Sequence, residues 1–276
     1  MGKMLSPATV ERFRETGFHF PAEALTRDEA ASYRRRLEGC EAASGGPLKG
    51  NSRHKVHLLF PWAQELIRHP RILDTMEDLL GPDILCWSTS IFTKEPHTPG
   101  FVSFHQDSTY WGLEPKIAVT AWVALSDCPV ESGPMRFVPG SHKTQLSHRD
   151  TFHKENLLTR GQEVEAKVDE ATAATVVLRA GEMSLHHVML VHGSGPNDSD
   201  DRRIGVAIRY VPTSVRQTKV RDCATLVRGQ DRFGHFDLEP APQADNDPAG
   251  IAAHTLAMER QVAALYQGTD HRRMRD

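Results

Sequence analysis

The pattern of apolar and polar positions changes near residue 83, from helical spacing before it to strand-like runs after it. Upstream, Ser6-Pro7 marks a helix start, and Thr26 with Glu29 forms the capping box of a second helix. Two short helices follow, the second over residues 70–81. We expect these helices to pack against the outside of a sheet.

Downstream, short apolar runs alternate with Gly, Pro and polar turns and predict strands with little helix between them. The runs are DILCWSTSIFTKE, FVSFHQDSTYW, IAVTAWVAL, PMRFV, ATVVL, EMSLHHVMLVH and RIGVAIRYV. This mainly β pattern is typical of a jelly roll, here the cupin-like double-stranded β-helix. The polar stretch over residues 143–173 is too long for an ordinary connection and predicts a lid or an insertion. Apolar spacing predicts a final helix over residues 251–265.

Length and composition fit a single domain and suggest neither nucleic acid nor a membrane as a partner. The 276 residues divide into a helical part over 1–82, a jelly-roll core over 83–213 and an extension over 214–276. The formal net charge of -3 provides no excess of positive charge for nucleic acid or a membrane. Four cysteines without a C-x-x-C pair, and no apolar signal core at the N-terminus, predict a reduced, cytoplasmic protein.

Three potential metal ligands stand out in the strand region. Residues i and i+2 of a β-strand share a face, so we expect His105 and Asp107 to point the same way. With His192 they give the two His and one carboxylate that form the facial triad of non-haem Fe(II) oxygenases. His186 shares strand parity with His192 but lies six residues away, about 20 Å along a strand, so these two are not expected to share a metal.

Arg203 lies 11 positions after His192, at the start of the next strand run. A hairpin between the two runs places its guanidinium near the metal, where a planar fork suits a carboxylate. Arg202 takes this place instead if the register shifts by one residue.

Five features follow one another along the chain: His105-x-Asp107, Trp122 in TAWVALSD, the run ESGPMRFVPGSHK, His192-Gly-Ser194 and Arg203. In this order they resemble the phytanoyl-CoA dioxygenase family of Fe(II)/2-oxoglutarate oxygenases. The resemblance covers residues 5–215. It implies that His105, Asp107 and His192 bind iron, that Arg203 pairs with the far carboxylate of 2-oxoglutarate, and that Ser194 and Trp122 help to hold this cosubstrate. Ser90, on the strand before the His-x-Asp motif, is a further candidate for the cosubstrate site.

The chemistry implied by this resemblance uses Fe(II), 2-oxoglutarate and O2, and releases succinate and CO2 while a substrate C–H bond is hydroxylated. Asp107 favours hydroxylation over halogenation, because related halogenating enzymes have a small residue at that position. Desaturation, ring formation and aminophosphonate hydroxylation remain open within the class. Two alternatives of other classes are a zinc metallohydrolase with the same three ligands and a non-catalytic cupin-like binding protein.

Residues near the expected mouth of the barrel indicate a small polar or anionic substrate. Arg209 shares strand parity with Arg203, and Tyr110 and Trp111 follow the His-x-Asp motif. His57 belongs to a basic stretch before the barrel that also contains Lys49, Arg53, His54 and Lys55. We therefore expect His57, Tyr110, Trp111 and Arg209 to contact the substrate.

Overall fold

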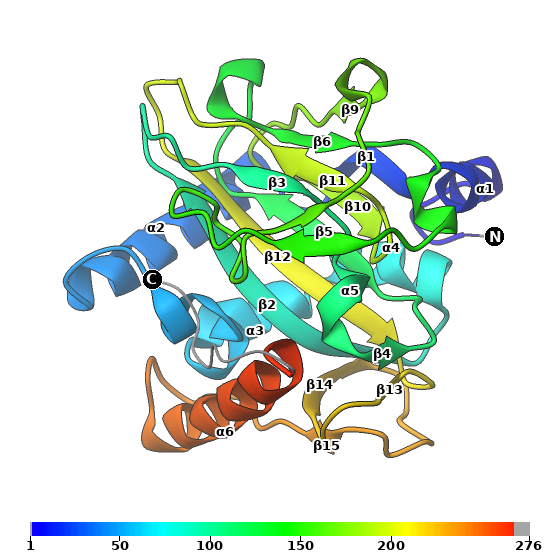
Figure 1. Ribbon diagram of the computed structural model, residues 1–276. Helices are drawn as coiled ribbons and strands as arrows, with labels where there is room; N and C mark the ends of the chain where they lie inside the picture. The colour runs from blue at the N-terminus through cyan, green and yellow to red at the C-terminus, as the bar shows by residue number, and fades with distance from the viewer. Residues whose placement is uncertain (1, 268–276) are drawn as a thin grey trace.

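The computed structural model describes residues 2–267, and its strands form two main sheets, one above the other (Figure 1). The larger sheet has the order β1-β10-β5-β12-β2-β14-β15. Its strands are β1 (Phe18–Glu23), β2 (Ile84–Lys94), β5 (Val119–Ala124), β10 (Glu182–His187), β12 (Arg203–Pro212), β14 (Cys223–Arg228) and β15 (Asp237–Leu238). All neighbours pair antiparallel except β14 and β15, which are parallel.

The smaller sheet has the order β3-β11-β6-β9. Its strands are β3 (Val102–His105), β6 (Met135–Phe137), β9 (Ala174–Thr175) and β11 (His192–Ser194). Two two-stranded sheets complete the strands: β4 (Leu113–Glu114) with β13 (Arg216–Gln217), and β7 (His148–Asp150) with β8 (Gln162–Val164). The mainly β class is as the sequence predicted, and two stacked antiparallel sheets are compatible with a jelly roll.

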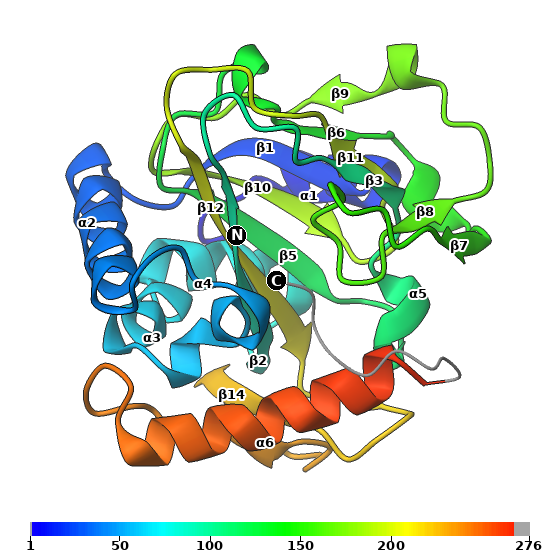
Figure 2. The ribbon, with the colours of Figure 1, turned by 60° about the vertical axis from the view of Figure 1, so that its left-hand side comes forward.

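Helices pack on the face of the larger sheet that is turned away from the smaller one (Figure 2). They are α1 (Pro7–Thr16), α2 (Arg27–Ala43), α3 (Pro61–Ile67) and α4 (Pro70–Leu80), with the 3-10 turns η1 (Gly50–Arg53) and η2 (Val56–Leu58) between α2 and α3. Both predicted caps are present, since Ser6 accepts from Thr9 and Thr26 forms its capping box with Glu29. Buried apolar residues of these helices and of the larger sheet form the main core.

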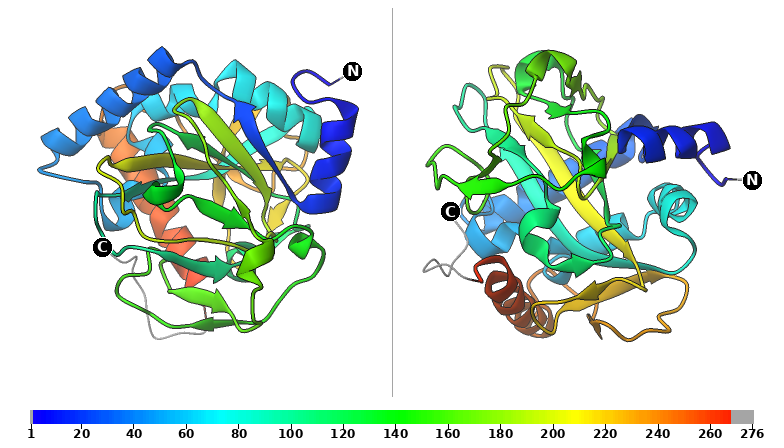
Figure 3. Two further views of the ribbon diagram at one scale, coloured as in Figure 1. Left: turned by 90° about the horizontal axis from the view of Figure 1, so that it is seen from above. Right: turned by 45° about the vertical axis from the view of Figure 1, so that its right-hand side comes forward.

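Short helices and one long helix complete the chain. They are α5 (Ser108–Trp111), η3 (Val130–Ser132), η4 (Ser141–Lys143), η5 (Glu170–Thr172) and α6 (Pro248–Leu265). Figure 3 shows α1 on one side of the molecule and α6 on another, beside β14. No helix within residues 2–267 combines the length and apolarity needed to cross a bilayer.

Three features of these regions differ from the sequence predictions. The region expected to be only helical also contributes β1, which pairs with β10 at the edge of the larger sheet. Past residue 213 the chain adds β14 and β15 to the same sheet. The final helix begins and ends close to its predicted bounds, but Ile251 and Leu256 are exposed, because its packed face contains smaller residues such as Ala257 and Gly250.

Candidate active site

Two histidines and one aspartate meet between the two sheets. β3 and β11 pair antiparallel with His192 directly opposite His105, and their ring centroids are 4.2 Å apart. The ligand atoms of His105, Asp107 and His192 lie within 4.8 Å of one another. The strand-parity argument for Asp107 was wrong, because β3 ends at His105 and Asp107 precedes α5 in a helical backbone conformation. A turn, rather than the pleat of a strand, brings the carboxylate to the imidazoles.

Hydrogen bonds of the imidazole rings leave one nitrogen of each available to a metal. Nδ1 of His105 lies 2.9 Å from the Ser103 carbonyl, and Nδ1 of His192 lies 3.0 Å from the Leu190 carbonyl. A carbonyl only accepts, so each Nδ1 carries the proton and each Nε2 keeps its lone pair. Nε2 of His105 is buried without a hydrogen-bond partner among the described residues. Two imidazole nitrogens and a carboxylate oxygen so placed fit a non-haem Fe(II) centre.

Burial and proximity set the charges of these groups. Burial, followed by repulsion from the neighbouring His105, lowers the pKa of His192 to about 4. Burial alone would raise the pKa of Asp107, but the nearby His105 and His192 hold it well below its usual range. At neutral pH, therefore, His192 is neutral and Asp107 is ionised, which are the forms that bind a metal.

A glycine permits the close approach of the strands that carry the histidines. A Cβ on Gly193 would lie 2.8 Å from the Val102 carbonyl oxygen of β3. Such a contact forces β3 and β11 apart, so the residue after His192 has no room for a side chain.

His186 lies beside this centre, although the sequence placed it far from His192. Its ring centroid is 4.7 Å from that of His192. The expected 20 Å separation assumed one continuous strand, whereas β10 ends at His187 and the chain turns before β11 begins in the other sheet. His186 is not part of the metal-ligand group.

A pocket between the sheets, here called the inner pocket, contains the three ligands and the residues expected to hold the cosubstrate. Trp122, Ser194 and Arg203 all line it. Arg203 is 2% exposed, and its guanidinium carbon lies 5.4 Å from the Trp122 ring centroid. Nε of Arg203 has no hydrogen-bond partner among the described residues. A buried guanidinium with an unused N–H calls for an acceptor such as a carboxylate.

Space for the Trp122 indole comes from a second glycine, which the sequence reading missed. A Cβ on Gly205 would lie only 1.8 Å from Cζ2 of Trp122. The indole thus occupies the position that a side chain at Gly205 would take. This packing holds the indole beside Arg203, two residues earlier on β12.

Lys94 is a further basic group that the sequence reading missed. It pairs directly with Arg203 across β2 and β12, is 2% exposed, and its Nζ lies 2.8 Å from Oγ of Ser194. Both Lys94 and Arg203 also donate to the Gly133 carbonyl. Burial, followed by repulsion from Arg203, lowers the pKa of Lys94 to about 6. The signal in the sequence was a lysine at the end of an otherwise uncharged strand, at a position that pairs with Arg203.

Arg202, the alternative to Arg203, points away from the inner pocket. Its guanidinium donates to both carboxylate oxygens of Glu41, at 2.6 and 2.8 Å, and to Glu95 at 2.6 Å. Arg202 is therefore occupied by ion pairs outside the pocket.

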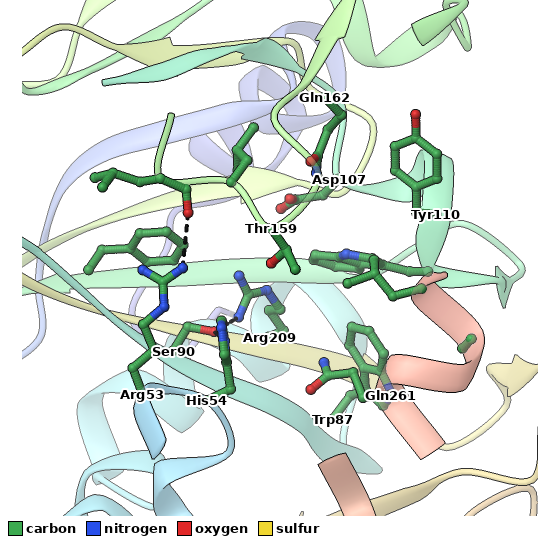
Figure 4. Close-up of a pocket in the computed structure, with 16 residues that line it drawn as sticks. Arg53, His54, Trp87, Ser90, Asp107, Tyr110, Thr159, Gln162, Arg209 and Gln261 are labelled. Carbon is green, nitrogen blue, oxygen red and sulfur yellow. Dashed lines mark hydrogen bonds between the residues drawn. The ribbon is translucent and has the colours of Figure 1, made fainter. Parts of the chain in front are cut away.

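A second pocket, here called the outer pocket, adjoins the inner one and shares Phe92, Asp107, Leu158 and Arg209 with it. Segments far apart in the sequence wall it (Figure 4). Its remaining lining residues are Arg53, His54, Trp87, Ser90, Tyr110, Trp111, Leu157, Thr159, Gln162, Gln261, Ala264 and Leu265. The structure thus places three expected substrate residues, Tyr110, Trp111 and Arg209, at one pocket.

Two residues lie elsewhere than expected. Ser90 faces the outer pocket, where its Oγ contacts Arg209 at 2.7 Å and His54 at 2.9 Å, because β2 places it four positions from Lys94 and away from Arg203. His57 faces neither pocket. It is fully buried, with its ring nitrogens bonded to Thr89 and Glu239, so it is not a substrate contact.

Comparison with known proteins agrees with this geometry. The family model described as phytanoyl-CoA dioxygenase (PhyH) matches residues 3–205, which is well over half of the chain. The chain belongs to the phytanoyl-CoA dioxygenase family. The three residues of the metal centre, and all residues of the inner pocket except Ala207 and Arg209, lie within the part that matches the PhyH family.

Similar proteins within and around the PhyH family differ in the substrates that their names state. A probable alpha-ketoglutarate-dependent hypophosphite dioxygenase of Stutzerimonas stutzeri is 31% identical over 56% of this chain and 54% of its own length. The ectoine dioxygenase of Streptomyces avermitilis is 25% identical over 86% of this chain and 88% of its own. The chain spans about half the length of several curated relatives, including human peroxisomal phytanoyl-CoA dioxygenase at 49%.

One solved structure resembles the protein over nearly its whole length. It is the apo form of the non-heme monooxygenase ThoJ, with 38% identity and a TM-score of 0.81 over 92% of this chain and 95% of that one. A nickel complex of ThoJ matches with 36% identity and a TM-score of 0.75.

Proposed function

We propose that the protein is an Fe(II)- and 2-oxoglutarate-dependent dioxygenase that hydroxylates a C–H bond of a small molecule, with release of succinate and CO2. The observation that carries this proposal is the position of His105, Asp107 and His192 at the wall of the same pocket as the buried Arg203. Membership of the phytanoyl-CoA dioxygenase family supports it. We interpret the two sheets as a double-stranded β-helix within one domain.

Six residues of the inner pocket have a defined part in this proposal. His105, Asp107 and His192 would hold the iron through two Nε2 atoms and a carboxylate. Arg203 binds the far carboxylate of 2-oxoglutarate, while Ser194 and the Trp122 indole hold the same group in place. Iron with 2-oxoglutarate and O2 supplies the oxidising power when bound, and the buried walls exclude water.

A zinc metallohydrolase needs the same three ligands but has no use for the rest of the inner pocket. In a hydrolase the metal activates water, and no dicarboxylate is required. Lys94 and Arg203 are both buried and have no carboxylate partner among residues 2–267, which favours the oxygenase.

The experiment is the anaerobic addition of Fe(II) and 2-oxoglutarate to metal-free protein. We expect a visible charge-transfer absorption band, which His192→Ala abolishes while the far-ultraviolet circular dichroism spectrum is retained. An exposed histidine provides the control, since His97→Ala lies outside both pockets and should keep the band. A wild-type protein without the band but with zinc-dependent hydrolysis would refute the proposal.

A further inference from the structure

The described residues of the outer pocket carry more positive than negative charge. Arg53 and Arg209 line it beside His54, which is neutral because burial lowers its pKa well below the usual range. The single acidic member among the described residues is Asp107, which belongs to the metal centre and also attracts Arg209. Burial lowers the pKa of Arg53, and the charge of Arg209 lowers it further. Two arginines that repel each other in a pocket that largely excludes water destabilise the folded protein unless an anion binds between them.

Hydrogen-bond donors without partners converge on the same space. Nε of Arg53 and Nε of Arg209 are buried and have no acceptor among residues 2–267. Native proteins rarely leave such groups unpaired. Arg209 is only 9% exposed, so water does not readily satisfy it.

The tautomer of His54 adds a third donor. NH1 of Arg209 donates to Oγ of Ser90 at 2.7 Å, so the Ser90 hydroxyl finds its acceptor in Nδ1 of His54 at 2.9 Å. Nδ1 then carries no proton, and Nε2 does. Nε2 of His54 is buried and unpartnered. The chain from Arg209 through Ser90 to His54 thus presents an additional N–H to a ligand rich in acceptors.

Aromatic side chains form a wall beside these donors. The ring centroids of Trp87 and Trp111 lie 4.9 Å apart, and the guanidinium carbon of Arg209 lies 5.1 Å from the Trp111 ring centroid. The Trp87 indole is fixed by its hydrogen bond to Asp222 at 2.7 Å. Rigid rings of this kind bind flat or apolar groups with little loss of conformational entropy.

We propose that the outer pocket binds the anionic group of the substrate, a carboxylate or phosphonate, between Arg53 and Arg209, and its apolar part against Trp87 and Trp111. This inference rests on the proposed function and names the substrate class of that site. Asp107 lies across the pocket from Arg209 (Figure 4). A substrate whose anionic group is bound at Arg209 therefore extends across the pocket and presents one of its C–H bonds to the metal centre. Among the basic residues expected near the mouth, Lys55 and His57 are excluded, because both bind Glu239 in the interior.

The test measures binding rather than turnover. Protein loaded with Zn(II) and 2-oxoglutarate is titrated by calorimetry with phenylacetate, with phenylphosphonate, and with phenylacetamide, a neutral molecule of the same shape as phenylacetate. We expect at least one acid to bind about tenfold or more tightly than the amide. Arg53→Gln and Arg209→Gln should each remove this preference, and the tighter acid identifies the head group.

Controls separate this inference from a folding defect and from the proposed function. Arg27→Gln removes an exposed arginine that pairs with Asp127 and should retain the preference, and thermal melting verifies that every variant is folded. Any of three results would overturn the inference: wild type binds acid and amide equally, wild type binds neither acid, or the preference for the acid survives either pocket substitution. If the anaerobic Fe(II)–2-oxoglutarate band is present in such a case, only the anion site is refuted. If the band is absent, the proposed function fails.

Discussion

We predict that Lys94 couples the binding of 2-oxoglutarate to the uptake of a proton. In the free protein its pKa is about 6 because of burial and of repulsion by Arg203. A unit negative charge about 6 Å from an ammonium group, at an effective dielectric constant of about 20, stabilises the charged form by about 2.8 kcal/mol. That energy corresponds to about 2 pKa units, so a carboxylate at Arg203 raises the pKa of Lys94 to about 8.

The size of the effect follows from these two values. At pH 7 a group with a pKa near 6 is about one-tenth protonated, and one with a pKa near 8 is about nine-tenths protonated, so binding takes up about 0.8 proton. The sign is also fixed. Because the bound form has the higher pKa, cosubstrate affinity weakens as the pH rises from about 6 to about 8 and is nearly constant outside that range.

The assay is calorimetric titration of Zn(II)-loaded protein with 2-oxoglutarate at pH 7, in two buffers with different ionisation enthalpies. The difference between the apparent enthalpies gives the number of protons taken up. Lys94→Gln should reduce this number by about 0.8, whereas Lys116→Gln, which changes an exposed lysine bonded to Gln145, should leave it unchanged. Equal proton uptake by wild type and Lys94→Gln would refute the assignment.

Three further predictions concern the cosubstrate, a packing contact and the polar stretch. Arg203→Gln should weaken 2-oxoglutarate binding by about 2–5 kcal/mol, or about 30-fold and more, because a buried charged pair is lost. Anaerobic absorption titrations measure this loss. If Arg202→Gln shows the loss and Arg203→Gln does not, the geometry is contradicted. Gly205→Ala should lower the free energy of unfolding by about 1–3 kcal/mol and weaken 2-oxoglutarate binding, because the new Cβ displaces the Trp122 indole. Its control is Gly39→Ala, where a Cβ meets nothing within 4 Å and denaturation curves should show no loss. Residues 143–173 are expected to act as a lid over the outer pocket, so protease cleavage within them should slow when Zn(II), 2-oxoglutarate and phenylacetate are all present; an unchanged rate would indicate a static insertion.

Local signals in the sequence predicted the helices and most of the strands well. Ser6 and the Thr26–Glu29 capping box each act within one helical turn, and both form the predicted hydrogen bonds. Strand β1 was missed because it is a single edge strand between two helices and pairs with β10, more than 150 positions later. Pairing at such a distance leaves no local trace.

The site residues divide in a similar way. His105 and His192 follow from motif order, and their cross-strand pairing brings them together. Asp107 reached the correct place through a turn that strand parity does not describe. His57 and Ser90 were misplaced because the direction of a side chain depends on partners distant in the sequence, such as Glu239 for His57. Spacing along the chain contains no information about those partners.

The walls of the outer pocket have different origins from the walls of the inner one. The inner pocket is lined mainly by strands of the two sheets. The outer pocket, besides Tyr110 and Trp111 of α5 next to Asp107, draws on three segments outside the two sheets: residues 53–54, residues 157–162, and the last turn of α6 at residues 261–265. Sequence change in these three segments therefore leaves the iron ligands and Arg203 undisturbed. In this architecture, new substrates can be acquired by exchanging peripheral parts, while the oxidative machinery is inherited unchanged.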